Sequence, residues 1–188
     1  MPSDNQFRAW CRRIKNSDRD AFAKVFDALH DPLARYALQL TGQKSVAQDV
    51  VQHAFAALWD MRSSLNPDES LEALLFRIVR NRSYNHSRDK RTRSKNHDIL
   101  QQEREPVRET PATDMDAERL DDHLRTWIED LPDRQREALS LSRFEGLSHE
   151  EIAEVMEIAP ATVNNHIVRA LKTLRGKVRS HHPDLQPL

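Results

Sequence analysis

The fold is decided by residues 146–167, which read GLSHEEIAEVMEIAPATVNNHI. Ser148 is a good helix N-cap, and Glu151 three residues later completes a capping box, so a helix is expected over 148–156. Pro160 suits the first position of a second helix, where its missing N–H costs nothing. The stretch therefore predicts a short helix and, after a turn of only three residues, a second helix whose apolar side continues to Val178.

The apolar residues of this stretch predict that the two helices cross closely. Ile152, Ala153 and Met156 lie on one side of the first helix, and small Ala153 allows a neighbouring backbone to approach. Val163 and Ile167 supply the buried side of the second helix. The pattern indicates a helix-turn-helix, whose protruding second helix fits the major groove of DNA. An ordinary helical hairpin is the alternative interpretation.

The outer side of the second helix favours DNA binding over that alternative. Asparagine can pair with adenine through two hydrogen bonds, and arginine or lysine reaches guanine or phosphate. No acidic residue occurs from Thr162 to Ser180, so the helix can approach the phosphate backbone. The candidate contacts are Thr162, Asn164, Asn165, His166, Val168, Arg169 and Lys172.

Helical periodicity continues on both sides of this motif. Towards the N-terminus, apolar residues at spacings of three and four lead from Leu120 to Leu131, Pro132 marks a helix start, and a helix is predicted over 133–143. Further back, four apolar stripes lie between residues 21 and 79. Helix breakers at Asp31-Pro32, Thr41-Gly42 and 65–68 predict separate helices.

Charge divides the 188-residue chain, although its net charge is only −1. From Arg77 to Lys95 there are eight basic residues against one acid, whereas residues 96–122 hold nine acids against three arginines. The stretch 97–116 is polar and lacks apolar periodicity, which is typical of a solvated linker. We expect an all-α protein with two small helical domains on a flexible acidic linker. The expected parts are domain 1–96, linker 97–116, domain 117–180 and tail 181–188.

Two further polar surfaces are predicted in the first domain. Arginines, amides and one aromatic ring recur at helical spacing, a combination suited to phosphates and unstacked bases. These residues are Arg77, Arg80, Asn81, Tyr84 and Arg88. An earlier helix carries a polar strip of Asp49, Gln52, His53 and Ala56, which by pattern alone is surface.

The composition argues against an enzyme. A single cysteine, Cys11, excludes an intramolecular disulfide and a cysteine-based zinc site, and it is expected to be a semi-buried helix residue rather than a redox sensor. Three glycines leave no phosphate-cradling loop, and His149-Glu150-Glu151 is not a zinc-binding HExxH motif. We expect no catalytic residues, no metal and no cofactor. No apolar run approaches the roughly 18 residues of a membrane span, so a cytoplasmic protein is expected.

Taken in order, these blocks resemble the extracytoplasmic function (ECF) sigma factors, the smallest group of the sigma-70 family. The matching stretches are AFAKVFDALHDPLARYA, AQDVVQHAFAALWDMR, LFRIVRNRSYNHSRDKR, LPDRQREALSLSRFEGLSHEEIAEVM and TVNNHIVRALKTLR. They cover nearly all of the chain except the linker and both ends. The resemblance implies a transcription initiation factor that gives core RNA polymerase its promoter specificity.

The resemblance assigns roles to the predicted surfaces. The strip of Asp49, Gln52, His53 and Ala56 would bind the β′ clamp helices of the polymerase. The loop from Ser63 to Leu71 would hold a flipped base of the −10 element. The residues that would contact the −10 DNA are Asn66, Asp68, Arg77, Arg80, Asn81, Tyr84, Asn85 and Arg88. The second domain would read the −35 element through the helix-turn-helix and touch the β flap.

The resemblance also implies partners. Besides core polymerase and promoter DNA, an anti-sigma factor is expected, and the free chain is expected to be a monomer. The motifs SRFEGLS and TVxxHI are similar to a branch common in Bacteroidetes, whose members often answer to a membrane-bound anti-sigma protein. Departures from the family pattern are Leu74, His53, Ala159 and the pair Asn164-Asn165, so the −35 sequence cannot be inferred from the family. A response-regulator output domain is the alternative, and it would require an α/β receiver domain.

Overall fold

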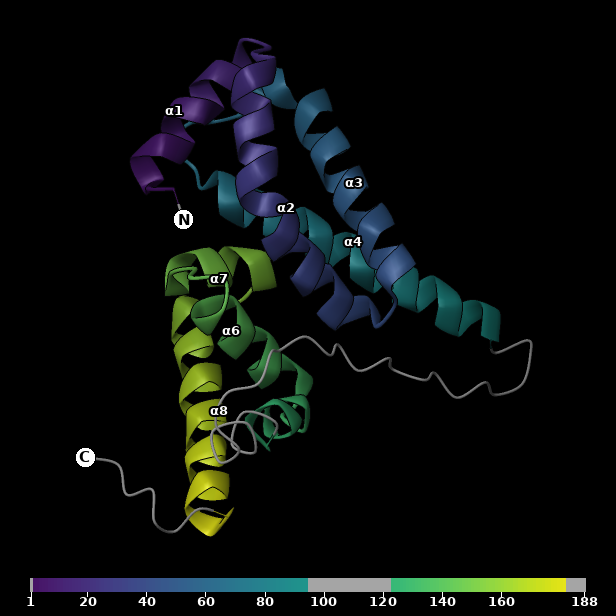
Figure 1. The fold of residues 1–188 in the computed structure, drawn as a ribbon, viewed down its shortest axis with the longest axis vertical. Coiled ribbons are helices and arrows are strands. Elements are labelled where there is room, and N and C mark those ends of the chain that lie inside the picture. The colour runs from purple at the N-terminus through teal and green to yellow at the C-terminus, as the bar shows by residue number, and fades with distance from the viewer. Residues whose placement is uncertain (1, 95–122, 182–188) are drawn as a thin grey trace, which may run out of the picture. The chain divides into compact units, whose positions relative to one another are not determined.

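The computed structural model describes residues 2–94 and 123–181, and within these ranges it contains helices and no strand. The elements are α1 (Asp4–Lys15), α2 (Arg19–Thr41), α3 (Lys44–Asp60), the 3-10 turn η1 (Arg62–Ser64), α4 (Leu71–Ser94), α6 (Asp133–Arg143), α7 (His149–Met156) and α8 (Pro160–His181) (Figure 1). Residues 123–129 are also helical. The described helices divide into two compact units, one with α1 to α4 and one with α6, α8 and most of α7. The all-α prediction is confirmed.

The first unit is built around α2, α3 and α4, which pack on one another (Figure 1). Its centre is formed by large side chains that solvent does not reach, including Tyr36, Leu58 and Phe76. The rings of Tyr36 on α2 and Phe76 on α4 lie 5.4 Å apart between centroids. Burial of such side chains contributes about 1.5–3 kcal/mol each, so this core holds the three helices in fixed orientation.

One predicted helix boundary in this unit is wrong. The sequence predicts a break at Asp31-Pro32, whereas α2 runs without interruption through a buried Pro32. Proline removes the hydrogen bond to the carbonyl four residues earlier, which usually interrupts a helix. Here the apolar stripe stays in register across the proline, because Leu29, Leu33 and Tyr36 all face the same core. Tertiary burial therefore outweighs the lost hydrogen bond.

For the first helix the sequence predicts no bounds, only that Cys11 lies in a helix. α1 begins after Ser3, whose backbone N–H donates to the Gln6 side chain at 2.8 Å. Only Phe7, Cys11 and Ile14 are buried along it, at spacings of four and three. Cys11 lies in a helix, as expected, but it is buried in the core rather than semi-buried, and this burial raises the pKa of its thiol.

The second unit follows its predicted elements closely. α6 has the predicted bounds, and the chain after it turns at Gly146, whose φ of 73° is left-handed. The segment before α6 packs on the far end of α8, where Trp127 lies 5.0 Å from the ring of His181. Asp130 accepts a hydrogen bond of 2.7 Å from the Lys177 ammonium. These contacts connect the beginning of the unit to its last helix.

Some predictions lie outside the described residues. The acidic linker over 97–116 and the tail after His181 are among them, so the boundaries between the predicted parts remain predictions. No helix in residues 2–94 or 123–181 combines the length and the apolar character needed to cross a membrane.

Candidate nucleic-acid interface

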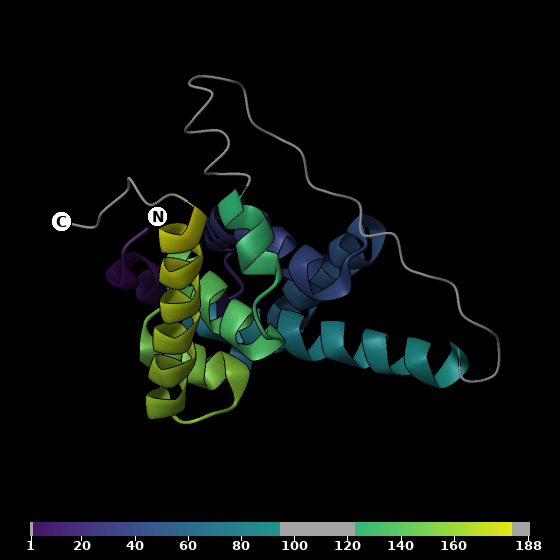
Figure 2. The same cartoon turned by 90° about the horizontal axis from the view of Figure 1, so that it is seen from below.

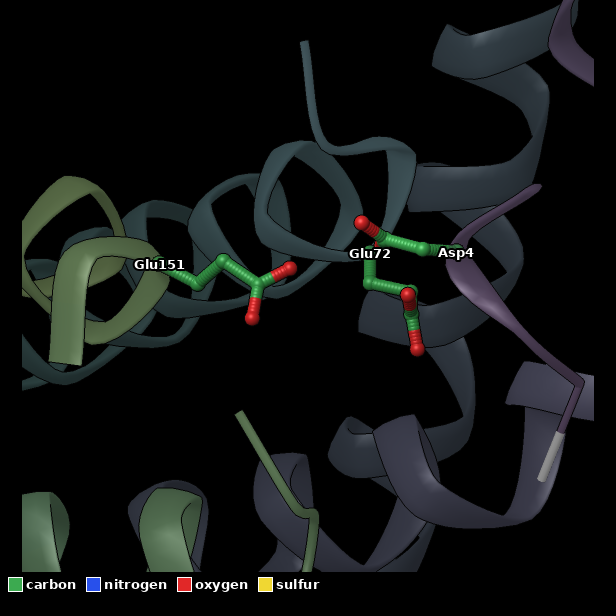
Figure 3. A group of neighbouring side chains, drawn as sticks. All are labelled: Asp4, Glu72 and Glu151. Atoms are coloured by element: carbon green, nitrogen blue, oxygen red, sulfur yellow. The ribbon is translucent and has the colours of Figure 1, made fainter. Parts of the chain in front are cut away.

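The start of α7 is fixed by the predicted capping box. The backbone N–H of Glu151 donates to Ser148 Oγ at 3.2 Å, and the N–H of Ser148 donates to Glu151 Oε2 at 2.9 Å. The Glu151 carboxylate that closes this exchange is drawn in Figure 3. Two helix-end N–H groups are thereby satisfied without any other part of the chain, which sets where the helix-turn-helix begins.

The turn between α7 and α8 is held by backbone hydrogen bonds. Glu157 adopts a left-handed conformation with φ 55°, and the N–H of Ile158 donates to the carbonyl of Ala153 at 3.1 Å. The carbonyl of Ala159 accepts from the N–H groups of Thr162 and Val163 at 2.8 and 3.2 Å. Ala159 therefore opens α8 with its backbone, although its side chain offers no capping oxygen.

α8 has one buried side and one open side, as the sequence predicts. Val163, Ile167, Ala170 and Leu174 are buried. The predicted contact residues Thr162, Asn164, Asn165, Val168, Arg169 and Lys172 are exposed, and His166 is half-buried. Val168 leaves 54% of its surface to solvent, so its methyl groups are accessible for contact with a thymine methyl group.

The second polar surface lies on α4, whose last turns extend past α2 and α3 (Figures 1 and 2). Asn81, Tyr84, Asn85 and Arg88 are exposed, and Arg77 is half-buried. Amides, an aromatic ring and cations therefore share one accessible stretch of helix.

Arg80 differs from this expectation. Only 5% of its surface is exposed, because its position aligns with the buried residues Phe76 and Ser83 rather than with the open side of α4. Its guanidinium lies over the ring of Tyr84, with 4.8 Å between the Cζ atom and the ring centroid. The prediction that Arg80 belongs to the open face is therefore wrong, and its observed contact is with the aromatic ring.

The loop before α4 contains the predicted residues Asn66 and Asp68, which are both exposed. Asn66 accepts a hydrogen bond from the backbone N–H of Asp68 and donates one to Glu69, each at 3.1 Å. The Lys15 ammonium of α1 donates to the carbonyl of Leu65 at 3.0 Å. The loop is thus shaped by its own side chains and anchored to α1.

The third surface is the strip on α3. Asp49, Gln52, His53 and Ala56 are all exposed, while Val50, Val51, Ala54 and Phe55 between them are buried. The strip is therefore a continuous outer side of one helix, as the spacing predicts.

A pair of acids outside these surfaces offers no defined metal centre. Asp4 on α1 and Glu72 on α4 bring carboxylate oxygens within 4.8 Å of each other (Figure 3). Both reach solvent, and Asp4 also lies 3.9 Å from Arg8 in an ion pair. Exposed acids of this kind are common on protein surfaces.

Two further cations are exposed on α8 beyond the predicted contact residues. Arg175 and Arg179 are exposed beyond Lys172, and steps of three and four residues connect them to it. That periodicity was available in the sequence as the signal for these two residues.

The fold and these surfaces define a DNA-binding transcription factor of two helical parts, and comparison with known families agrees. The sigma-70 region 2 family model matches residues 25–93, and the sigma-70 region 4 model matches residues 122–174. The chain belongs to the sigma-70 family, whose members are transcription initiation factors and not known enzymes. The response-regulator alternative is not favoured, because region 2 helices occupy the place of a receiver domain.

Within that family the chain is an ECF RNA polymerase sigma factor. It is 26% identical over 180 residues to the ECF sigma-E factor of Haemophilus influenzae, covering 92% of this chain and 95% of that protein. It is 29% identical over 175 residues to the sigma-E factor of Escherichia coli K12, covering 89% and 91%.

Two solved structures share the fold. CnrH in complex with the cytosolic domain of CnrY matches with a TM-score of 0.67 and 22% identity, covering 94% of this chain and 99% of that one. The sigma factor RpoE of Bartonella quintana, in complex with the anti-sigma factor NepR, matches with a TM-score of 0.71 and 23% identity, covering 86% and 98%.

Proposed function

We propose that this sigma factor directs core RNA polymerase to its promoters by reading the −35 duplex with α8 and by engaging the unpaired −10 strand with α4. The proposal rests on the two different sides of α8. One side is buried against its own unit, and the other is open and carries amides and cations and no acid. An acid-free helix face that protrudes from a helix-turn-helix fits the major groove in charge and in width.

On the duplex, the first turns of α8 read bases and the later ones contact phosphate. Asn164 and Asn165 stand near the N-terminal end of the helix, which is the end that faces base edges in such motifs. The exposed Val168 meets a thymine methyl group, and Arg169 and Lys172 neutralise phosphates or pair with guanine. Thr162 and the half-buried His166 complete the contact set.

On the −10 element, Tyr84 is the stacking platform for an unpaired base. Its ring is 41% exposed, and the Arg80 guanidinium covers it at 4.8 Å, which holds the ring in a fixed orientation. Stacking on an aromatic ring contributes about 1–3 kcal/mol per base, which offsets the few kcal/mol needed to unstack it. The surrounding contacts to the strand are Arg77, Asn81, Asn85 and Arg88, with Asn66 and Asp68 from the loop.

The α3 strip binds the β′ clamp helices of core polymerase, and the second unit touches the β flap. The polymerase then performs the chemistry of RNA synthesis in the cytoplasm. The fold neighbours CnrH and RpoE were solved in complex with CnrY and with the anti-sigma factor NepR, respectively. By analogy, an anti-sigma factor holds this chain inactive until a signal releases it.

The first test is co-elution of the purified chain with core RNA polymerase on a sizing column, at moderate salt and without DNA. Stoichiometric co-elution is expected, because a sigma factor binds core polymerase before it meets a promoter. If the chain elutes alone under conditions where a known sigma factor co-elutes, the proposal is wrong.

The second test reverses one charge on α8. Arg169→Glu should weaken binding of the holoenzyme to a promoter selected from random DNA by about 1.5–3 kcal/mol, roughly tenfold or more, because a charge-assisted hydrogen bond becomes a repulsion. Arg19→Glu makes the same charge change at an exposed position of the first unit and serves as the control. Equal promoter affinity of both variants at fixed salt would refute the −35 assignment.

A further inference from the structure

α8 is longer than base reading requires. Its 22 residues span about 33 Å at 1.5 Å per residue, whereas the contact residues from Thr162 to Lys172 span roughly 15 Å. The region 4 match ends at residue 174, and α8 continues to His181. The major groove is only about 12 Å wide, so the last turns of a helix seated in it extend towards the phosphates at its rim.

Those last turns continue the open side of the helix. Successive residues turn by about 100°, so Arg169, Lys172, Arg175 and Arg179 fall on one side, opposite Ala170 and Leu174. The four cations are exposed, and the two apolar residues are buried. A basic stripe therefore runs along the C-terminal half of α8.

The fifth cation, Lys177, belongs to the fold instead. Lys177 points to the packed side of α8, where its ammonium donates a hydrogen bond of 2.7 Å to the Asp130 carboxylate. The residue as a whole is half-buried. That bond connects α8 to the segment before α6. The two arginines on either side of Lys177 make no comparable contribution to the packing of the unit, so their charge is available to an outside partner.

Gly176 is the second observation that points to a partner. It is exposed and lies beside Lys172 and Arg179, four and three residues away along the helix, and it has ordinary helical backbone with no atom within 4 Å of where a Cβ would stand. Glycine is less favourable than alanine inside a helix, and neither packing nor a left-handed φ requires it here. A missing side chain on an exposed helix face lets another backbone approach closely.

We propose that Arg175, Gly176 and Arg179 form a phosphate-contacting extension of the recognition helix, with the DNA backbone beside the −35 element as its partner. The inference rests on the proposed function and deepens it. The two arginines neutralise phosphates, and Gly176 allows the sugar-phosphate chain to lie against the helix beside Lys172 and Arg179. The extension adds affinity that does not depend on base sequence.

The test is the salt dependence of binding of the full chain to a fluorescein-labelled 30-base-pair duplex of mixed sequence, followed by fluorescence anisotropy. Each phosphate contact contributes about 0.9 to the slope of log K against log salt concentration. The double variant Arg175→Gln/Arg179→Gln should therefore lower the slope by about 1.8. Arg169→Gln should lower it by about 0.9, and Lys177→Gln, whose charge is engaged by Asp130, should leave it unchanged.

The outcomes separate the two proposals. A normal slope in Arg175→Gln/Arg179→Gln together with a reduced slope in Arg169→Gln would overturn the extension and leave the proposed function standing. Normal slopes in both would overturn the proposed function and the extension with it. Unchanged DNA binding with weaker co-elution on core polymerase would overturn the DNA extension and assign the stripe to an acidic protein surface.

Gly176→Leu tests the close approach without changing charge. The added side chain meets open space within the chain, so the thermal midpoint should not fall. DNA affinity at fixed salt should fall several-fold, since the leucine occupies the place of the phosphate chain. Wild-type affinity in this variant would overturn the role of Gly176.

Discussion

Truncating Ile152 to alanine tests whether the helix-turn-helix unit stands on its own core. Ile152 lies on α7 and none of its surface is exposed. Removing buried methyl and methylene groups from such a site costs about 2–5 kcal/mol, because the cavity fills only in part. At roughly 0.05–0.15 kcal/mol per residue, a unit of about 60 residues has a total stability of about 3–9 kcal/mol. Ile152→Ala should therefore remove a large share of the stability of this unit.

The chain offers a selective probe for this experiment. Trp127 is the only tryptophan after residue 59, and 6% of its surface is exposed in the second unit. In a Trp10→Phe/Trp59→Phe background, its fluorescence reports the unfolding of that unit alone during a urea titration. The midpoint should fall sharply in Ile152→Ala. Val168→Ala removes an apolar group that is 54% exposed on the same unit, and it should change stability by no more than about 0.5 kcal/mol.

The reasoning is refuted if Ile152→Ala and Val168→Ala give the same midpoint. It is also refuted if the first unit loses stability to the same extent, as measured by the fluorescence of a Trp127→Phe chain that keeps the other two tryptophans. That second result would mean that the units unfold as one body.

Three further predictions concern other parts of the molecule. Gln52→Ala/His53→Ala should weaken co-elution with core polymerase and leave binding to free DNA unchanged; equal polymerase affinity would show that the α3 strip is wrongly assigned. Ser148→Ala should lower the stability of the second unit by about 1 kcal/mol through loss of the α7 cap, measured by urea unfolding, and an unchanged midpoint would contradict it. Backbone N–H groups and the Arg13 side chain hold the pKa of Asp18 below its ordinary value of 3.8. The Asp18 carboxylate therefore stabilises the fold above pH 3.8, and this stabilisation is lost as the pH falls through the lowered pKa. In Asp18→Asn the free energy of unfolding should therefore fall less steeply with decreasing pH in the acid range. The same pH dependence in the variant and the wild type would show that protonation of Asp18 does not affect stability.

Local signals made the second unit predictable. Pro132, Ser148 and Pro160 each carry a chemical preference for one position at a helix start, and the structure uses all three there. The buried and open sides of α8 also follow from spacing alone, because a helix repeats every 3.6 residues whatever it packs against.

The errors arise where tertiary structure overrides local preference. Pro32 is tolerated because the apolar stripe continues on both sides of it, and a proline rule applied locally cannot weigh that burial. Arg80 is placed by its alignment with Phe76 on the packed side of α4, whereas charge alone predicts exposure. The miss at α1 has no such cause, because its buried residues Phe7, Cys11 and Ile14 recur at spacings of four and three and this signal was present in the sequence. The contacts of the surface residues with polymerase and DNA depend on partners, so neither sequence nor fold fixes them.

The burial of Cys11 makes the chain suitable for site-specific labelling of introduced cysteines. Only 2% of this cysteine is exposed and burial raises the pKa of its thiol, so little of the reactive thiolate forms at neutral pH. A cysteine introduced at exposed Ala23 on α2, outside the α3 strip, and another at exposed Thr173 on α8 would therefore accept maleimide dyes while the native thiol stays unmodified. Energy transfer between the two dyes would then report any change in the separation of α2 and α8 when core polymerase or promoter DNA is added.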